Sequence, residues 1–214
     1  YNYLCSIVIL LEKEEKKMIK NIIFDIGGII LEWGNNPLIE LLNKTDYEVN
    51  KICKIIYGDS RFKECILGNL SQFQYMKQLM NENPIYSYDI EKILSEKYQE
   101  KALPVIKENL EKICELKNKG YKIYFLSNIT DVSYNYLNDK LNILDMVDGG
   151  VYSCKEHLKK PSKEIFDTLI KRFDLNKEET IFFDDSQKNV KAGNEYGVKS
   201  YVFNSIKDIT ALEL

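Results

Sequence analysis

Short apolar runs recur along the chain, and polar or turn-forming residues bound each run. Continuous runs rich in β-branched and aromatic residues are typical of strands buried in a parallel sheet. The runs that fit this description lie at residues 20–25, 122–126, 146–152, 180–184 and 199–203. Since helical patterns separate the later runs, the sequence predicts an α/β fold with a doubly wound parallel sheet.

Three helices are predicted beside the later strands, one before the strand at 122–126 and two after the strand at 146–152. Apolar residues repeat at helical spacing over 104–119, and Gly120 follows where glycine commonly ends a helix. A proline in the first turn favours a helix over 161–173. Ser186 can cap a third helix that runs to Tyr196.

The segment 37–103 carries only helical patterns. Residues suited to N-caps precede its amphipathic stretches, namely Thr45 before 46–56, Ser71 before 72–80 and Ser87 before 88–101. A single crossover between two parallel strands needs far fewer residues. We therefore expect an inserted α-helical cap domain over 37–103, with 18–36 and 104–214 forming the core domain. The alternative is a helical bundle that contributes only stability.

Residues 1–17 differ from the rest of the chain, because an apolar stretch is followed by a run of Glu and Lys. A secretory signal would begin with basic residues and end in a small-residue cleavage site, and both features are missing. We expect an extension outside the core, with a membrane-targeting segment as the alternative.

The composition is that of an ordinary globular protein. The chain has 214 residues, of which 44% are hydrophobic and 29% charged, and its net charge is −3. No basic excess suggests a nucleic-acid partner, and no apolar stretch is long enough to span a membrane. Five cysteines without a CxxC pair favour reduced thiols and a cytoplasmic location. The single histidine, His157, is expected to be a surface or packing residue.

Polar residues with useful chemistry stand at or near the ends of the predicted strands. They are Asp25, Ser127, Lys160, Asp184 and Asp185. Because ligands bind at the carboxyl ends of parallel strands, these side chains are expected to meet at one edge of the sheet. Together they can bind a divalent cation and a phosphoryl group. Taken singly, each also fits a turn, a loop or a helix cap.

Four motifs, in this order, carry a resemblance to a known family. They are Phe24-Asp25-Ile26-Gly27-Gly28, Leu126-Ser127-Asn128, Lys160-Pro161 and Phe182-Phe183-Asp184-Asp185-Ser186. From about Met18 to its end, the chain resembles the haloacid dehalogenase-like hydrolase superfamily. Its Asp-x-Gly start is similar to that of the sugar-phosphatase branch typified by α-D-glucose-1-phosphatase. The resemblance implies a Rossmann-like α/β core whose active site is covered by an inserted helical cap.

The resemblance also implies catalytic and phosphate-binding roles. Asp25 is expected to attack phosphorus and form an aspartyl phosphate. Ser127 and the backbone N–H of Asn128 are expected to bind the phosphate at the start of the following helix. Lys160 is expected to neutralise the phosphate and the neighbouring carboxylates.

A Mg²⁺ site is implied at the same edge of the sheet. The resemblance gives Asp25, the main-chain carbonyl of Gly27 and Asp185 as direct ligands, and places Asp184 nearby or behind a water. Hard oxygen ligands and a substrate phosphate suit Mg²⁺, which keeps several of its waters.

Gly27 departs from the family pattern, in which a second aspartate protonates the leaving group. A general acid typically contributes about 10²–10⁴-fold to the rate. Without that acid, a leaving group that departs readily is favoured. An anomeric oxygen is a better leaving group than a primary alkoxide, which favours a sugar 1-phosphate as the substrate.

Three functions compete on this sequence. The favoured one is a Mg²⁺-dependent phosphatase that acts on a small phosphorylated metabolite, with a sugar phosphate preferred, as a monomer or small homo-oligomer. The alternative is a non-catalytic or regulatory binding protein with the same fold. A carbon–halogen hydrolase is disfavoured, because those metal-free enzymes lack the pair formed by Asp184 and Asp185. Specificity is expected to depend on the cap, with Trp33, Arg61 and Phe62 as candidates.

Overall fold

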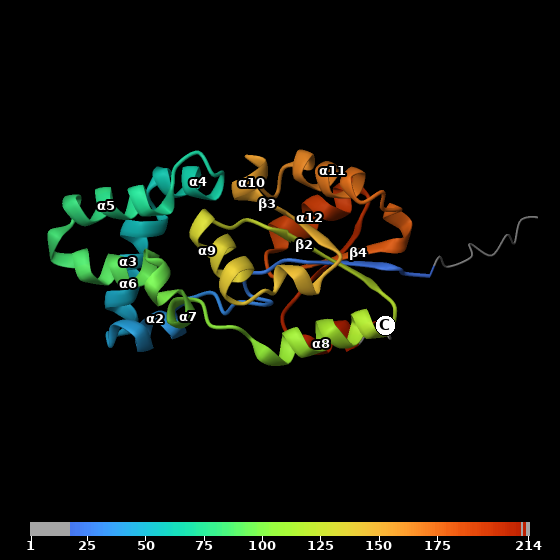
Figure 1. Cartoon of the computed structure of the whole chain (residues 1–214), viewed down its shortest axis with the longest axis horizontal. Helices are drawn as coiled ribbons and strands as arrows, with labels where there is room; N and C mark the ends of the chain where they lie inside the picture. The colour runs from blue at the N-terminus through green and yellow to red at the C-terminus, as the bar shows by residue number, and fades with distance from the viewer. Residues whose placement is uncertain (1–17, 211, 213–214) are drawn as a thin grey trace, which may run out of the picture.

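A parallel five-stranded sheet forms the centre of the molecule (Figure 1). The structure is a computed structural model that describes residues 18–210 and residue 212, so the predicted extension 1–17 lies outside the described residues. The strands are β1 (Asn21–Phe24), β2 (Lys122–Ser127), β3 (Gly149–Tyr152), β4 (Thr180–Asp184) and β5 (Lys199–Val202). They lie in the order β3-β2-β1-β4-β5 with every neighbouring pair parallel, which confirms the predicted fold class.

The strand β3 is shorter than the predicted strand over 146–152. Residues Leu144–Met146 instead form a 3₁₀ helix, η4. The Asp148 carboxylate accepts a hydrogen bond of 3.0 Å from the Ile123 N–H, and the Asp148 N–H donates to the Ile123 carbonyl at 2.8 Å. Because Asp148 occupies both backbone groups of Ile123, the ladder between β2 and β3 begins only at Gly149.

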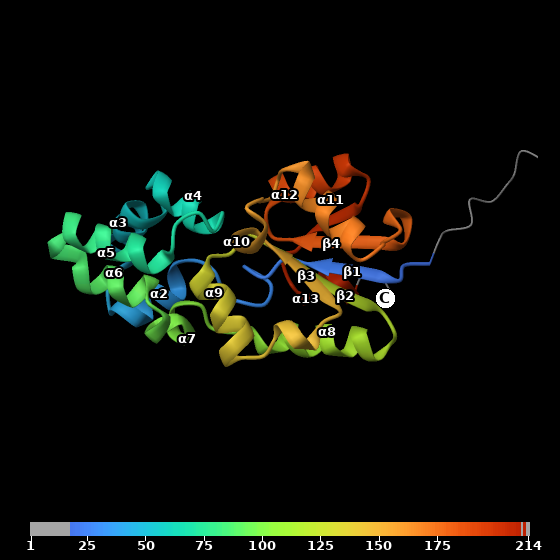
Figure 2. The ribbon, with the colours of Figure 1, turned by 45° about the horizontal axis from the view of Figure 1, so that its top comes forward.

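Helices cover both faces of the sheet (Figure 2). These helices are α8 (Lys107–Asn118), α11 (Lys163–Arg172), α12 (Gln187–Tyr196) and α13 (Ile206–Thr210). The face formed by α8 and α13 packs on Ile22 and Phe24 of β1. The opposite face, formed by α11 and α12, packs on Ile23. The central strand is therefore buried on both sides, as its continuous apolar run predicted.

Two of the core helices begin later than predicted. The predicted helix over 104–119 begins only at Lys107, because Val105 forms an antiparallel bridge with Leu31. The predicted helix over 161–173 begins at Lys163. Shorter core helices are α9 (Asp131–Asn135), η3 (Tyr136–Lys140), α10 (Ser153–Glu156) and η5 (Lys177–Glu179). None of the helices that the structure describes combines the length and hydropathy needed to cross a membrane.

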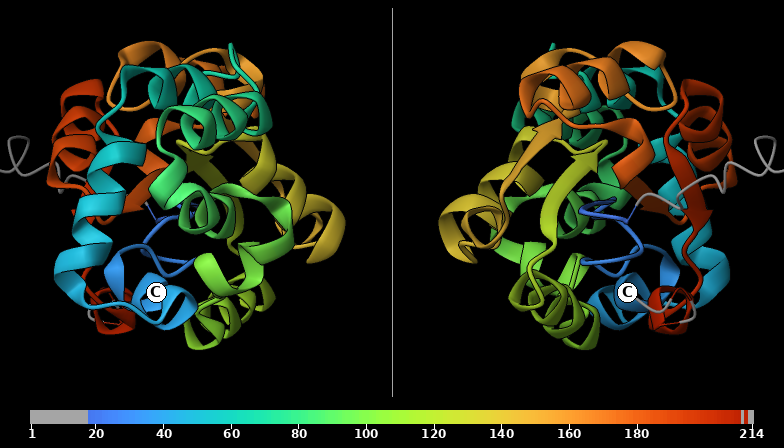
Figure 3. Two further views of the ribbon diagram at one scale, coloured as in Figure 1. Left: turned by 90° about the vertical axis from the view of Figure 1, so that its left-hand side faces the viewer. Right: turned by 90° about the vertical axis from the view of Figure 1, so that its right-hand side faces the viewer.

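A unit made of helices lies beyond the carboxyl ends of the strands, in the segment between β1 and β2 (Figures 1 and 3). Its elements are α2 (Asn35–Leu42), α3 (Asp46–Tyr57), α4 (Ser60–Ile66), α5 (Gln72–Glu82), η1 (Pro84–Tyr86), α6 (Ser87–Leu94), η2 (Glu96–Tyr98) and α7 (Gln99–Ala102). Their apolar residues, from Leu38 to Ala102, form a hydrophobic cluster separate from the two on the sheet. We call this unit the cap.

Two of the three predicted N-caps of the cap helices are confirmed. At the start of α3, the Thr45 hydroxyl accepts from the Glu48 N–H, and the Glu48 carboxylate accepts from the Thr45 N–H at 2.9 Å. This reciprocal pair is a capping box. At the start of α5, the Ser71 hydroxyl accepts from the Phe73 N–H.

The prediction of a single helix over 88–101 is wrong, because this segment forms α6, η2 and α7. The backbone becomes extended at Ser95, which separates α6 from η2 and α7, and Ser87 lies inside α6 rather than at its cap. The side-chain amide of Gln72, from α5, donates to the Leu94 carbonyl at the end of α6. A contact from a neighbouring helix therefore replaces the hydrogen bond that would continue α6. The local sequence pattern does not predict this contact.

The two connections between the core and the cap run side by side. The Ile106 N–H donates to the Ile30 carbonyl at 2.8 Å, and the Glu32 N–H donates to the Pro104 carbonyl at 2.8 Å. This paired connection places the cap directly beside the carboxyl end of β1.

Candidate active site

The predicted site residues meet where the strands end. β1, β2 and β4 share one register. Asp25 follows β1 directly, while Ser127 and Asp184 are the last residues of β2 and β4. One carboxylate oxygen from each of Asp25, Asp184 and Asp185 lies within 4.8 Å of the others. The parallel sheet therefore brings together three acids that are distant in sequence.

A buried lysine lies between two of these acids. The Lys160 ammonium is 2.8 Å from Asp25 Oδ1 and 2.6 Å from Asp184 Oδ2. The side chains of Lys160 and Asp184 are both fully buried. A charge at this depth is costly without a partner, so the lysine and the two carboxylates stabilise one another.

The carboxylate of Asp184 is saturated by the protein. Its Oδ1 accepts from the Ser186 N–H at 2.8 Å and from the Asn189 side-chain amide at 3.0 Å. Its Oδ2 accepts from Lys160 and, at 3.1 Å, from the same amide. Asp184 is therefore suited to orienting Lys160. Asn189 was not predicted, and only its place one turn into the helix after the acid pair hints at this contact.

Two of the carboxyl groups have raised pKa values. Burial raises the pKa of Asp25 to about 6, with a further contribution from Asp184, although Lys160 acts in the opposite direction. Burial and the charge of Asp184 also raise the pKa of Asp185. Among the described residues, the ammonium in ion-pair contact with this group of acids is that of Lys160, which pairs with Asp25 and Asp184, so the negative charge of the three carboxylates is incompletely neutralised.

A divalent cation fits this excess of negative charge, because the donors are hard oxygens. Asp185 is exposed toward solvent, and its side chain packs against the turn that follows β1. A Cβ atom at Gly28 would lie 2.4 Å from Asp185 Oδ2, and Gly28 has φ of +73°. Gly28 therefore makes room for the Asp185 carboxylate beside Asp25.

The neighbouring glycine, Gly27, has a different environment. A Cβ atom placed on Gly27 would meet no atom within 4 Å among the described residues, and its φ lies outside the left-handed region. Gly27 also lines the cavity described below. The backbone there accepts a side chain, so the missing aspartate is a difference in sequence and not a requirement of the turn.

Asn128 is positioned differently from the prediction. Its side-chain amide donates to the Lys160 carbonyl at 3.0 Å, and its Oδ1 accepts from the Lys160 N–H at 2.8 Å. The helix that follows β2 begins only at Asp131, so Asn128 does not lie at a helix start. Ser127 is buried and, like Asn128, lines the cavity.

A cavity of about 350 Å³ lies between this edge of the sheet and the cap. Asp25 and Asp185 line its core side, while the cap contributes mainly apolar residues. Of the three predicted specificity residues, Trp33 and Phe62 line the cavity. Arg61 is not part of this lining.

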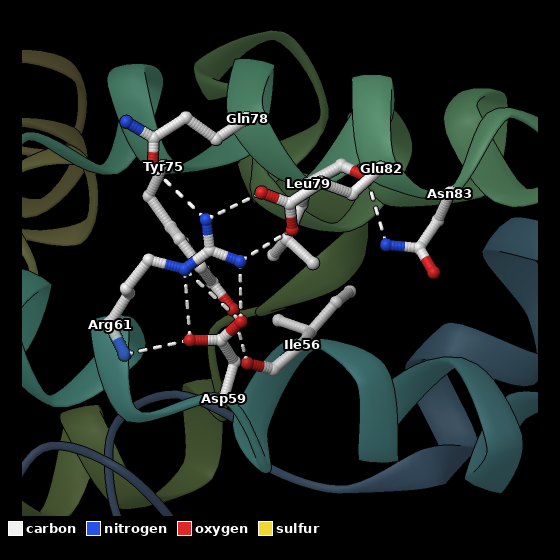
Figure 4. Close-up of polar contacts among 8 residues, drawn as sticks. All are labelled: Ile56, Asp59, Arg61, Tyr75, Gln78, Leu79, Glu82 and Asn83. Atoms are coloured by element: carbon white, nitrogen blue, oxygen red, sulfur yellow. Dashed lines mark hydrogen bonds and ion pairs between the residues drawn. The ribbon is translucent and has the colours of Figure 1, made fainter.

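Arg61 instead holds helices of the cap together (Figure 4). Its guanidinium binds the Asp59 carboxylate through Nε and Nη2, and the Glu82 carboxylate through Nη1 and Nη2. Nη1 also donates to the Gln78 side chain at 3.2 Å. The fork of Arg61 thus connects the start of α4 with the last turns of α5.

His157 connects the core with the cap. Its Nδ1 lies 2.8 Å from the Leu67 carbonyl and 3.1 Å from Asn69 Oδ1, both in the loop between α4 and α5. In the same loop, the Gly68 backbone packs so closely on the Cys154 carbonyl that a Cβ would lie 2.1 Å from it. His157 is thus an exposed packing residue, as predicted.

The fold and these residues define a hydrolase of a known family. A family model described as haloacid dehalogenase-like hydrolase matches residues 19–197. The match covers most of the chain, so the protein belongs to the haloacid dehalogenase-like hydrolases, as its motifs predicted.

The chain is similar to known phosphatases over most of its own length and most of theirs. The chain is 25% identical over 179 residues to a sesquiterpene phosphatase of Aspergillus oryzae, covering 84% of this chain and 87% of the relative. It is 27% identical over 199 residues to D-ribitol-5-phosphate phosphatase of Bacteroides thetaiotaomicron, covering 86% and 91%. A solved family enzyme from the same bacterium, in complex with magnesium and inorganic phosphate, has a TM-score of 0.71 and 21% identity, covering 91% of this chain and 98% of that one. This last likeness shows a shared fold.

Proposed function

We propose that the protein is a Mg²⁺-dependent phosphatase of small phosphorylated metabolites. The observation that carries this proposal is the buried Lys160 ammonium between Asp25 and Asp184, with Asp185 beside them at a cavity. The names of both curated relatives, which are phosphatases, support it.

Asp25 is the residue that we assign as nucleophile. The described contacts of its carboxylate, from the Ile26 N–H at 2.7 Å and Lys160 at 2.8 Å, both fall on Oδ1. Oδ2 is therefore the oxygen that attacks phosphorus. The new Oδ2–P bond replaces the bond between phosphorus and the leaving oxygen, and water then hydrolyses the aspartyl phosphate to inorganic phosphate.

Lys160 and Ser127 bind the transferring phosphoryl group in this proposal. The Lys160 ammonium compensates the negative charge that gathers around phosphorus, and its fixed position means that it needs little reorganisation during the reaction. Asp184 and Asn128 act as positioning residues, because one holds the ammonium and the other holds the backbone of Lys160.

Asp25, Asp185 and the Gly27 carbonyl are the groups that we assign to holding Mg²⁺, with Asp184 nearby, where its carboxylate accepts from Lys160 and Ser186. When bound, the ion supplies positive charge that polarises the phosphoryl oxygens. The complex of the structurally similar family enzyme with magnesium and phosphate supports Mg²⁺ as the ion.

The relatives do not select one leaving group, since their names specify a sesquiterpene and a sugar alcohol. A sugar phosphate, preferred on the sequence, stays a prediction. The same holds for a cytoplasmic location and for a monomer or small homo-oligomer.

The proposal is tested by the hydrolysis of an aryl phosphate. We expect turnover to require Mg²⁺, to stop in excess chelator, and to be abolished by Asp25→Asn. Asp145→Asn is the matched control, because Asp145 is exposed in η4, away from the sheet edge. Full activity of Asp25→Asn would refute the nucleophile. A wild-type protein that binds Mg²⁺ and phosphate without any turnover would favour the non-catalytic alternative.

A further inference from the structure

The cap side of the cavity is an apolar wall. Among the described residues, the cap and its connections contribute aromatic or aliphatic side chains to the lining, apart from two glutamines. They include Trp33, Tyr57, Phe62, Ile66, Ile93 and Leu94. The charged side chains in the described lining are Asp25 and Asp185, and both belong to the catalytic edge.

Three aromatic rings form a continuous part of this wall. The ring centroids of Trp33 and Tyr57 are 5.3 Å apart, and those of Tyr57 and Phe62 are 5.0 Å apart. Trp33 is 52% exposed, although it is a large apolar residue. A ligand that covers this surface removes apolar area from water, which is favourable in proportion to the area.

Four polar side chains of the same cavity make hydrogen bonds within the protein. Gln72 donates its amide to the Leu94 carbonyl. The Thr130 hydroxyl donates to the Ser133 hydroxyl, which donates in turn to the Gln99 amide oxygen, both at 3.3 Å. A sugar alcohol carries more hydroxyls than the few polar groups left in this lining can pair, and a hydroxyl that loses its hydrogen bonds to water without a new partner is costly.

We propose that the substrates are phosphate monoesters of apolar alcohols, whose hydrocarbon part lies against the aromatic and aliphatic wall of the cap. This proposal rests on the proposed phosphatase function and competes with the sugar phosphate that the sequence predicts. The phosphoryl group then binds beside the pair formed by Asp25 and Lys160, facing Asp25 Oδ2, and the apolar part extends past Gly27, which adds no side chain to the cavity.

A series of n-alkyl phosphates tests the proposal, compared with a six-carbon sugar alcohol phosphate esterified at its primary hydroxyl. Both kinds of ester lose a primary alkoxide, and the extra hydroxyls make the sugar alcohol the slightly better leaving group. A preference for hexyl phosphate must therefore come from binding. We expect kcat/KM to rise about threefold to fourfold per added methylene until the cavity is filled.

Trp33 gives a second measurement that does not depend on turnover. It is the single tryptophan of the chain, so intrinsic fluorescence reports on this wall. In the wild-type protein with Mg²⁺, we expect hexylphosphonate to change the emission at concentrations at least about tenfold lower than methylphosphonate.

Ile66→Gln is the matching variant, with Ile85→Gln as its control. Ile66 lines the cavity, whereas Ile85 is 89% exposed in η1. We expect Ile66→Gln to lower the ratio of kcat/KM for hexyl over methyl phosphate by about tenfold, and Ile85→Gln to leave it unchanged. If Ile66→Gln does not fold, the alkyl phosphate series and the fluorescence titration of the wild-type protein still test the proposal.

The outcomes separate the two proposals. Equal kcat/KM values along the alkyl series, or faster hydrolysis of the sugar alcohol phosphate, would overturn the apolar substrate class and leave the phosphatase intact. Failure to hydrolyse any ester, aryl phosphate included, would overturn the phosphatase. The phosphonate titration would then still show whether the cavity prefers an apolar ligand.

Discussion

Asn128 and Lys160 hold each other through two hydrogen bonds that join the end of β2 to the loop before α11. The Lys160 N–H donates to Asn128 Oδ1 at 2.8 Å, and the Asn128 amide donates to the Lys160 carbonyl at 3.0 Å. The pair fixes the backbone from which the Lys160 side chain reaches Asp25. Asn128 therefore acts on catalysis through the position of Lys160.

Asn128→Ala should reduce kcat by about 10- to 100-fold, because a small displacement of a catalytic group is costly to the rate. It should also lower the free energy of unfolding by about 1–2 kcal/mol, since two hydrogen bonds are lost. Steady-state kinetics and urea unfolding measure the two effects. Asn138→Ala is the control, because Asn138 contacts only its neighbour Asp139 among the described polar partners. An unchanged kcat in Asn128→Ala would show that Lys160 is positioned without this pair.

The pH dependence of stability follows from Asp25. Its pKa of about 6 in the folded protein exceeds the ordinary value of 3.8, so the folded state binds this proton more tightly than the unfolded state. In the metal-free protein, the stabilisation from this proton is complete below pH 3.8 and is lost as the pH rises to about 6. The loss is on the order of 2–3 kcal/mol.

Mg²⁺ competes with the same proton, so it should stabilise the protein more at about pH 7.5 than at about pH 5. Thermal unfolding with and without Mg²⁺ over this pH range measures the difference. Asp25→Asn should flatten the pH dependence in the absence of metal. A Mg²⁺-induced shift of the melting temperature that is the same at both pH values would contradict the assignment of Asp25 as a ligand.

The sheet and its catalytic edge were predictable because both depend on local patterns. Runs such as Ile22 to Phe24 identify buried strands, and parallel strands end at one edge, so residues as distant as Asp25 and Asp184 could be placed together. The contacts that hold these residues were not predictable. The amide of Asn189 reaches Asp184 from a helix, and this depends on how that helix packs on the sheet.

The structure of the cap was less predictable from local patterns than that of the sheet. Local signals located Thr45 as an N-cap, but the break at Ser95 and the surroundings of Arg61 arise from contacts between helices. An arginine beside an aromatic residue could be a substrate ligand or part of an ion pair, and sequence spacing does not distinguish them. The partner that decides it, Glu82, lies on another helix.

Arg61→Ala should therefore affect stability more than catalysis. We expect the melting temperature to fall by roughly 2–5 °C, because a forked guanidinium contributes more than a single exposed pair. The value of kcat/KM should stay within about threefold of wild type, since Arg61 does not line the cavity. Differential scanning calorimetry and steady-state kinetics test both statements.

Arg172→Ala is the control for Arg61→Ala, because Arg172 binds one carboxylate, that of Glu156. Its melting temperature should fall by less. A loss of more than about tenfold in kcat/KM for Arg61→Ala, with stability unchanged, would restore Arg61 as a substrate ligand.

Gly27→Asp and Gly28→Ala should have opposite consequences, although the two positions are adjacent. At Gly27 a side chain meets open space beside the cavity and φ is not left-handed, so an aspartate can be placed where the family has its general acid. We expect Gly27→Asp to fold normally and to raise kcat for primary alkyl phosphates by about tenfold or more, while aryl phosphates change little, because only poor leaving groups need the proton.

Gly28→Ala should lose activity on every ester, because its Cβ would displace Asp185 and its backbone is left-handed. The measurement is kcat for an alkyl and an aryl phosphate in both variants, with far-UV circular dichroism to verify folding. If a folded Gly27→Asp protein shows no gain on alkyl phosphates, another group or a bound water already supplies the proton in the wild type.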